Sequence, residues 1–332
     1  MKVAFVEPHL ELFGGIRRIL ELSNRLTARG VEVTLFHPAG TPCDWMECAA
    51  GVRPSEELLA APQDVIVYND PNPYDFNLVR RAEARLKVFY VLELYETSLL
   101  GGFHPTIYRP RHQRTLYMKR SLQAGYLLLT NATWLSTFLS ERMGLESTLL
   151  FGGVNREMFH PLERPPNDVF RVLCSGDPRP RKGTETIRRA VDLARRTRED
   201  IELETYHGRG VPQHEMFSVY GAADLFIEAS TQAGWNNPAA EAMACGVPLI
   251  CTDIGGVRDF AMHDETALLA PPGDVAALSA AILRMAGDET LRRRLSAAGL
   301  QRIERFDWDR SADRLFQLLQ ARLEVPVEAG RV

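Results

Sequence analysis

Short apolar runs alternate with amphipathic helical stretches along most of this chain. Near the start, residues 3–6 form an apolar run, and after a glycine pair the apolar side chains recur at helical spacing over residues 16–26. Gly30 is a suitable residue to end this helix, and residues 31–36 are then predicted as a strand. These segments form one βαβ unit, whose crossover is right-handed and whose strands are parallel.

The alternation continues, with one interruption, to the end of the chain. It predicts further strands over residues 64–68, 88–92, 126–129, 172–175, 201–206, 225–227 and 248–251. It predicts helices over residues 76–86, 132–143, 184–195, 214–223 and 238–245, and helices that begin at Val275, Glu289 and Trp308. The interruption is a polar, proline-rich stretch at residues 159–167, which is predicted to be a linker.

This order predicts an α/β protein with two Rossmann-like, doubly wound parallel-sheet domains. We expect an N-terminal domain over residues 1–161, a C-terminal domain over residues 162–307 and a closing helix over residues 308–332. Ligands bind such sheets outside the carboxyl ends of the strands. If the two domains face each other across a cleft, one binding site lies at their interface.

Composition narrows the class of function. The length of 332 residues suits two domains, and 45% hydrophobic with 25% charged residues is ordinary for a globular protein. The net charge of −4 disfavours general nucleic-acid binding. No apolar stretch is long enough to span a bilayer, and Glu7 comes too early for a signal peptide, so we expect a cytoplasmic protein. The five cysteines have no metal-ligand spacing, so we expect neither a disulfide framework nor a structural metal.

The strongest phosphate-binding candidate is the loop at residues 176–183, between a predicted strand and a predicted helix. A helix start offers unpaired N–H groups and a partial positive charge. Arg179, Arg181 and Lys182 add full positive charges at the same point. The alternative is a solvated basic loop, but the strand–loop–helix setting favours phosphate binding. The Walker spacing is absent, so the loop is not a P-loop.

Two other strand-to-helix junctions are candidates. Gly14 and Gly15 would let a ligand approach the backbone closely, although a tight turn without a ligand explains the pair as well. Within residues 234–246, Pro238 suits the first turn of a helix, and Glu241 follows one turn later. Its carboxylate can accept two hydrogen bonds from hydroxyls, as from a ribose. Alternatively it only complements the helix dipole, an effect worth less than about 1 kcal/mol.

Residues 238–248, which read PAAEAMACGVP, closely resemble the most characteristic stretch of the family-4 glycosyltransferases. The flanking stretches ADLFI at 223–227 and DIGGV at 253–257, and GVN at 153–155, also resemble the family. The resemblance covers nearly the whole chain. It implies the GT-B fold and a retaining hexosyltransferase that uses a nucleotide-sugar donor. It further implies that the last helix, from about Trp308, crosses back onto the first domain.

The resemblance implies roles for the candidates named above. Lys182, with one or both of Arg179 and Arg181, would stabilise the charge that develops on the leaving diphosphate, and Gly14 and Gly15 would add backbone N–H groups. These cations and helix ends would do the work of a metal ion, so no metal cofactor is expected. The expected donor-binding residues of the C-terminal domain are Gly210, Val211, Trp235, Asn236, Asn237, Pro238 and Glu241.

Several positions depart from the family pattern. Ala233 stands where the family has a glutamate that contacts the donor sugar, and Asp177 stands where it has an arginine. The family's N-domain histidine is absent from residues 89–96, a segment that resembles some rhamnosyl- and deoxysugar-transferring relatives. A site without the glutamate would lack a strong acceptor for sugar hydroxyls, so our hypothesis is a deoxyhexose donor. The alternative is a catalytically impaired GT-B protein that binds a nucleotide or a partner.

The acceptor side of the prediction is less specific. Glu93 could orient the acceptor hydroxyl or take its proton, or it could be a surface carboxylate, and Tyr95 and Glu96 are alternatives. Residues 108–120 mix basic and apolar side chains, which can contact anionic lipid headgroups or an acceptor phosphate. A solvated helix face is the common alternative. We expect a sugar, lipid-linked or small-molecule acceptor, and peripheral contact with the inner face of the membrane as a lesser hypothesis.

Overall fold

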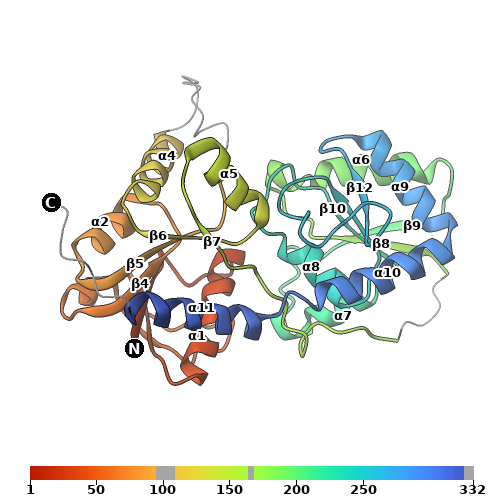
Figure 1. Ribbon diagram of the computed structural model, residues 1–332. Coiled ribbons are helices and arrows are strands. Elements are labelled where there is room, and N and C mark those ends of the chain that lie inside the picture. Colours follow the sequence, from red (N-terminus) through yellow and green to blue (C-terminus); the bar gives the residue numbers. More distant parts are fainter. Residues whose placement is uncertain (95–108, 164–167, 325–332) are drawn as a thin grey trace. The chain divides into compact units, whose positions relative to one another are not determined.

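The computed structural model describes residues 1–94, 109–163 and 168–324, with only the backbone of residues 109–112. The chain divides into two compact units. The first contains Met1–Phe151 together with the chain from Trp308 onward, and the second contains Gly152–Asp307. Each unit has a parallel sheet with helices on its faces (Figure 1).

The boundary between the units lies between residues 151 and 152 and not, as the sequence predicted, between residues 161 and 162. The reason is local bonding of the connecting stretch. The backbone N–H of Val154 donates to the carbonyl of Phe306 over 2.9 Å, and Val154 forms a parallel bridge with Asp307. Further along, the rings of Phe159 and Tyr220 lie 6.0 Å apart. The stretch is therefore built into the second unit and does not link the units freely.

The sheet of the first unit has the strand order β3-β2-β1-β4-β5-β6-β7, and the neighbouring strands are parallel. Its strands are β1 (Lys2–Val6), β2 (Glu32–His37), β3 (Gly51–Pro54), β4 (Gln63–Tyr68), β5 (Ala84–Val91), β6 (Leu127–Thr130) and β7 (Thr148–Leu149). Its helices are α1 (Gly14–Ala28), η1 (Ser55–Leu59), α2 (Pro73–Arg81), α4 (Arg109–Leu122), α5 (Thr133–Met143) and α11 (Trp308–Glu324). From β1 to β3 each new strand is added on one side of the sheet, and from β4 onward each new strand is added on the other side. The topological switch point therefore lies between β1 and β4.

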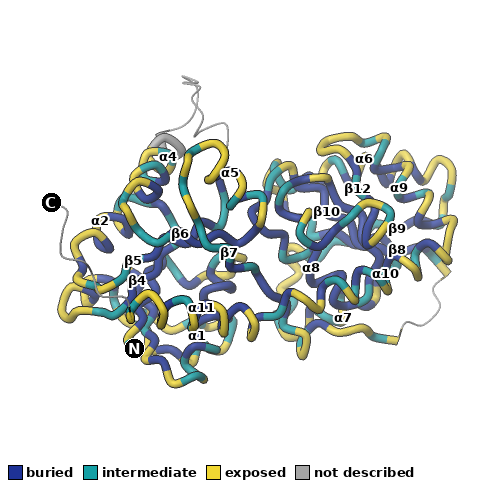
Figure 2. The backbone as a smooth tube through the Cα atoms, in the orientation of Figure 1, coloured by how far each residue is buried: buried dark blue, intermediate teal, exposed yellow. Residues whose placement is uncertain are grey.

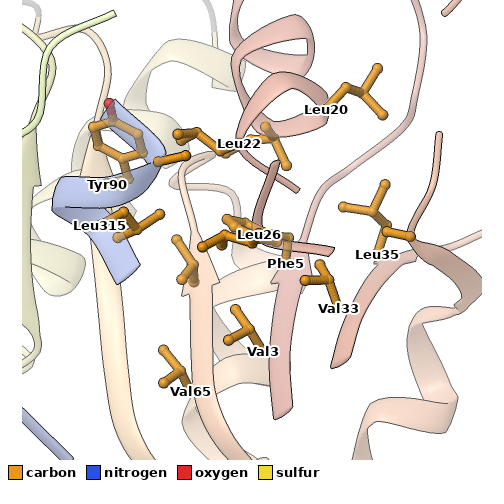
Figure 3. Packing of buried hydrophobic residues seen from close by; sticks show 14 of the residues in the cluster. Val3, Phe5, Leu20, Leu22, Leu26, Val33, Leu35, Val65, Tyr90 and Leu315 are labelled. Carbon is orange, nitrogen blue, oxygen red and sulfur yellow. The ribbon is translucent and has the colours of Figure 1, made fainter. Parts of the chain in front are cut away.

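Alternating side chains along the strands build two cores in the first unit. Val3 and Phe5 of β1 pack with α1 and α11 on one face, whereas Ala4 and Val6 pack with α2, α4 and α5 on the other. Figure 3 shows the first core, in which Leu315 of α11 lies among side chains from β1, β4 and α1. The central strands are largely buried, whereas the outer surfaces of the helices are exposed (Figure 2).

Helix α11 is fixed to the first unit by a buried cation. The Arg18 guanidinium lies 5.3 Å from the ring of Trp308 and donates to the Tyr90 hydroxyl over 3.1 Å. That hydroxyl donates to the carbonyl of Leu150 over 2.6 Å. Because Trp308 is only 1% exposed, this cation–π contact is shielded from water and correspondingly strong. The last helix is thus part of the first unit's core.

The second unit has the strand order β12-β11-β10-β8-β9, again with parallel neighbours. Its strands are β8 (Phe170–Cys174), β9 (Ile201–Thr205), β10 (Leu225–Glu228), β11 (Leu249–Thr252) and β12 (Leu268–Ala270). Its helices are η2 (Pro180–Lys182), α6 (Thr184–Arg195), η3 (Gln213–Glu215), α7 (Met216–Gly221), α8 (Asn237–Ala244), α9 (Val275–Gly287) and α10 (Glu289–Ile303). Across the part of the chain that the structure describes, no helix combines the length and apolar character needed to cross a membrane.

The structure confirms most of the predicted elements and corrects one boundary. The helix over residues 184–195 and the helix starts at Val275, Glu289 and Trp308 are observed as predicted. The helix predicted over residues 76–86 is wrong at its end, because α2 stops at Arg81 and β5 already begins at Ala84. Leu86 is paired with Val65 of β4, so its apolar character belongs to a strand. The short strands β3, β7 and β12 were not predicted.

A buried carboxyl group at the start of α2 makes the stability of the first unit depend on pH. Asn72 caps this helix by accepting from the backbone N–H of Asp75 over 2.8 Å, and its side-chain amide donates back to the Asp75 carboxyl. Burial raises the pKa of Asp75 to about 7, with the hydrogen bond from Asn72 opposing and the charge of Asp70 reinforcing the rise.

We expect Asp75→Asn to weaken the pH dependence of folding. The folded-state pKa of about 7 lies above the ordinary value of 3.8. The contribution of Asp75 to the free energy of unfolding is therefore fully present below pH 3.8 and is lost as the pH rises to about 7. The loss can reach about 4 kcal/mol at 1.36 kcal/mol per unit. Urea unfolding across this range should show a shallower fall for the variant, with a residual slope from buried Glu7, whose pKa burial also raises. Equal slopes would contradict the assignment.

Candidate active site

The predicted donor-binding residues gather at the carboxyl edge of the sheet in the second unit. Strand β8 lies between β9 and β10, so the topological switch point lies between β8 and β10. The loop after β8 leads through η2 into α6, and the loop after β10 leads into α8. Both helices therefore begin beside the crevice in which parallel sheets bind their ligands.

Gly183 locks these two loops together. It joins η2 to α6 with a φ of 67°, and an added Cβ would lie 2.0 Å from the carbonyl oxygen of Ala229, directly after β10. The backbone N–H of Thr231 donates to the carbonyl of Arg181 over 2.9 Å. Only glycine allows this approach, because a side chain would displace the backbone of the neighbouring loop. The contact holds Arg181 and Lys182 at the switch point.

Asp177 binds Arg179 within the same loop. The Arg179 Nε lies 3.0 Å from each carboxylate oxygen of Asp177, and the Arg179 backbone N–H donates to Oδ1 over 2.9 Å. Burial raises the pKa of Asp177, but hydrogen bonds from Arg179 and the charge of Lys182 outweigh it and lower this pKa to about 2. The carboxylate of Asp177 therefore offsets part of the positive charge that Arg179 brings to this loop.

Lys182 is the predicted cation that stands directly before Gly183. Its side chain is half-buried, and its positive charge helps to lower the pKa of Asp177. No acid among residues 1–94, 109–163 and 168–324 forms an ion pair with Lys182. An ammonium group in this position can neutralise part of a diphosphate's charge.

Helix α8 begins with a side-chain cap. The Oδ1 of Asn236 accepts from the backbone N–H of Ala239 over 3.2 Å, and Pro238 occupies the first turn. Asn236 is 2% exposed, and its Nδ2 has no hydrogen-bond partner among the residues described. A buried amide that lacks a partner is costly, so a ligand oxygen accepting from this group would be bound favourably. Asn237 and Pro238 are half-buried at the same helix start.

The side chain of Trp235 lies in an aromatic cluster of the second unit. Its ring lies 4.9 Å from the rings of both Phe260 and Phe306, and the residue is 8% exposed. These three rings form an aromatic cluster inside the second unit. The indole of Trp235 thus packs in the core of the second unit, its backbone leads into α8, and donor binding by this residue stays a prediction.

Gly210 and Val211 lie in the turn that follows β9. The backbone N–H of His207 donates to the carbonyl of Ser175, in the loop after β8, over 2.8 Å. Gly210 is exposed with a φ of 66°, and Val211 is half-buried. The hydrogen bond places this turn beside the cationic loop, where a nucleoside could contact both.

Glu241 lies in the second turn of α8 and is 6% exposed. Its Oε2 accepts from the hydroxyl of Tyr220 over 2.9 Å, and the Tyr206 and Tyr220 hydroxyls lie 3.3 Å apart. The helix dipole acts most strongly in the first turn, and Glu241 lies beyond that turn. Interaction with the dipole is therefore the weaker explanation for this acid. Sequence reasoning missed both tyrosines, because no spacing rule connects them with Glu241.

The remaining predicted residues lie in the first unit, at the carboxyl edge of its sheet. Gly14 is the first residue of α1. An added Cβ at Gly15 would lie 3.3 Å from Cδ1 of Leu92, so the glycine allows close packing of the loops after β1 and β5. Glu93 is half-buried directly after Leu92. The structure thus brings Gly14, Gly15 and Glu93 to one edge.

Other candidates are only partly described. Tyr95, Glu96 and residue 108 lie outside the described residues. In the described part of α4, Arg114 pairs with Asp70, and Met118 is buried in the core, whereas Leu116 is 46% exposed. Within residues 1–94, 109–163 and 168–324, no three His, Cys, Asp or Glu side chains are grouped so that they could hold a metal ion. Independence from metal stays a prediction.

We expect Gly183→Ala to destabilise the second unit far more than Gly208→Ala. Both glycines have positive φ, which costs a side chain about 1–2 kcal/mol, but nothing lies within 4 Å of an added Cβ at Gly208. At Gly183 the Cβ would overlap the carbonyl of Ala229, so we expect a cost of about 3 kcal/mol or more. Urea unfolding of both variants measures the difference, and equal costs would show that the loops are not locked at this point.

Comparison with known proteins identifies the family of this chain. A family model described as Glycosyl transferases group 1 matches residues 157–288. The phosphatidyl-myo-inositol mannosyltransferase of Mycobacterium leprae is 34% identical, and the alignment covers 96% of each chain. The chain spans only 26% and 57% of two other curated relatives that it matches.

Two solved structures share the fold. The sucrose-phosphate synthase of Thermosynechococcus elongatus is 20% identical with a TM-score of 0.75, over 96% of this chain and 98% of that one. Anabaena HepE in complex with UDP and glucose is 15% identical with a TM-score of 0.70, over 97% of this chain and 100% of that one. These findings agree with the family-4 resemblance of residues 238–248. The chain therefore belongs to the group 1 glycosyltransferases and has the GT-B fold.

Proposed function

We propose that this protein transfers a sugar from a nucleotide-sugar donor to an acceptor hydroxyl, with retention of anomeric configuration and without a metal ion. One observation carries the proposal: the cationic loop at Lys182 and the start of α8 with Glu241 lie at one topological switch point. The solved structure of HepE holds UDP and glucose, and the relative from M. leprae is a mannosyltransferase by name. Both support a nucleotide-sugar donor.

The chemistry follows from the charges at this edge. The bond between the sugar C1 and the diphosphate oxygen breaks, and both bonding electrons leave with the diphosphate. The ammonium of Lys182, the nearby Arg181 and the N–H groups at the helix starts stabilise the growing negative charge. The addition of backbone N–H groups by Gly14 and Gly15 stays a prediction from the sequence. The acceptor oxygen bonds to C1 and gives up its proton, with Glu93 as the candidate that orients or deprotonates it.

The identity of the donor sugar depends on residue 233. Ala233 is 7% exposed, and an added Cβ at Gly256 would lie 2.5 Å from its carbonyl oxygen, so the backbone here is tightly packed. Without a carboxylate at this position, the site lacks a strong acceptor for a sugar hydroxyl. We propose a deoxyhexose donor on this ground, because a buried sugar hydroxyl without a hydrogen-bond partner costs about 1–3 kcal/mol.

A second candidate function is a catalytically impaired protein that binds a nucleotide. Its support is also residue 233, where the family's glutamate is replaced by alanine.

Peripheral contact of residues 108–120 with the cytoplasmic face of the membrane stays a prediction, and so does a lipid-linked acceptor. The exposed Leu116 on α4 is compatible with such contact.

We expect Lys182→Met to weaken the binding of a nucleoside diphosphate by about tenfold or more, as loss of one charge-assisted hydrogen bond would. Arg189→Met is the matched control, because Arg189 is an exposed cation in the adjoining helix α6. Titration calorimetry with UDP and GDP measures affinity, and an assay of donor hydrolysis or transfer measures turnover. If Lys182→Met bound and turned over as the parent does, the diphosphate would have to lie elsewhere.

We expect the parent protein to use a deoxyhexose nucleotide with a higher kcat/KM than the fully hydroxylated hexose on the same nucleotide. The absent carboxylate at residue 233 is the physical reason. A panel of nucleotide sugars, matched in the base, measures transfer or hydrolysis, and nuclear magnetic resonance of the product reads the anomeric configuration. Preference for the fully hydroxylated sugar would refute the deoxyhexose proposal. Tight nucleotide binding with no turnover of any donor would favour the second candidate function.

A further inference from the structure

Two tyrosines from different elements converge on the carboxylate of Glu241. Tyr220 lies at the end of α7, and its hydroxyl is 2.9 Å from Oε2 of Glu241. Tyr206 directly follows β9, and its hydroxyl is 3.3 Å from that of Tyr220. The three groups form a hydrogen-bonded chain that crosses from the turn after β9 to α8.

The hydrogen bond between Tyr220 and Glu241 sets the direction of the other hydrogen bond in this chain. The hydroxyl of Tyr220 donates its proton to Oε2 of Glu241. A tyrosine has one hydroxyl proton, and therefore Tyr206 must donate to the oxygen of Tyr220. Burial, followed by the charge of Glu241, raises the pKa of Tyr206 and of Tyr220 far above neutrality, so both keep their protons.

The chain is held rigidly. Tyr220 is fully buried, and its ring lies 5.3 Å from that of Phe226 and 6.0 Å from that of Phe159, both in edge-to-face orientation. The ring of Tyr206 packs edge-to-face against the ring of Tyr220, and their centroids lie 5.9 Å apart. Because neighbouring rings fix the ring of Tyr220, they also fix the position of its hydroxyl. The hydrogen bond from this hydroxyl in turn fixes Oε2 of Glu241.

We propose that Tyr220 is a positioning residue, which holds the Glu241 carboxylate in the orientation that accepts hydrogen bonds from the ribose of the donor. This inference rests on the proposed function, because it needs a ribonucleotide at the switch point. Tyr206 extends the same network to the turn that carries Gly210 and Val211. One hydrogen-bonded chain thus connects the predicted nucleobase turn with the predicted ribose carboxylate.

A purely structural role would look different in a binding experiment. If Tyr220 only satisfies a buried carboxylate, removal of its hydroxyl weakens the fold and affects all ligands alike. If Tyr220 positions Glu241, removal affects only ligands that carry ribose hydroxyls. Comparison of UDP with 2′,3′-dideoxy-UDP, and of the two guanine counterparts, separates these cases because each pair differs only in the hydroxyls.

The test is titration calorimetry of the parent, Tyr220→Phe and an exposed hydroxyl control, Tyr74→Phe, with these ligands. We expect the parent and the control to bind the ribonucleotide more tightly than its dideoxy analogue by about tenfold or more, as expected for hydrogen bonds to a charged acceptor. In Tyr220→Phe this ratio should fall by about fivefold or more, while the affinity for the dideoxy analogue stays unchanged.

Two further variants, Glu241→Gln and Tyr206→Phe, test the same hydrogen-bonded chain. Glu241→Gln should lose the same discrimination, and adding Tyr220→Phe to it should cause no further loss, because Tyr220 acts through Glu241. Should Tyr220→Phe be unstable, Tyr206→Phe is expected to reduce the ratio by a smaller factor, since it removes only the bond to Tyr220. An unchanged ratio in Tyr220→Phe overturns the proposal, and so does an unchanged ratio in Tyr206→Phe where Tyr220→Phe does not fold.

The outcomes separate this inference from the proposed function. A parent that binds the ribonucleotide and its dideoxy analogue equally refutes the ribose role of Glu241, and the inference falls with it. A parent that binds neither refutes the donor site itself. A parent that discriminates, together with a Tyr220→Phe variant that discriminates equally well, overturns only the role of Tyr220.

Discussion

The close approach of Gly183 to the carbonyl of Ala229 is the constraint on which the candidate donor site depends. It joins the loop after β8 to the loop after β10, the two strands that flank the topological switch point. A glycine with positive φ is needed, because any side chain would overlap the neighbouring backbone. The position of Lys182, one residue earlier, is a direct consequence of this backbone contact.

Buried polar groups in both units are held by specific partners. Asp177 is bound by Arg179, and Glu241 is bound by Tyr220. In the first unit, Arg18 is placed between Trp308 and Tyr90 and fixes the last helix. In each case a charged group is removed from water and given a defined hydrogen bond or ring contact, so its position is determined more narrowly than apolar packing alone would allow.

Local chemistry made some parts of the site predictable. The loop at 176–183 could be located because cations and glycines stand between an apolar run and a helical pattern, and Gly183 indeed ends the loop. Asn236 and Pro238 start α8 because their side chains suit a helix N-terminus. The end of α2 was misplaced, since residues 84–86 are compatible with helix spacing and only pairing with β4 makes them a strand.

The sequence by itself determined the alternation of strands and helices, the two parallel sheets and the loops that carry the cations, because these depend on periodicity and on residues close together in the chain. Only the tertiary structure decided that Trp235 packs against Phe260 and Phe306 and that Tyr220 binds Glu241. These contacts join residues from separate elements, such as Tyr220 and Glu241, which are 21 positions apart. No local preference encodes them, because they arise only when separate elements are packed together.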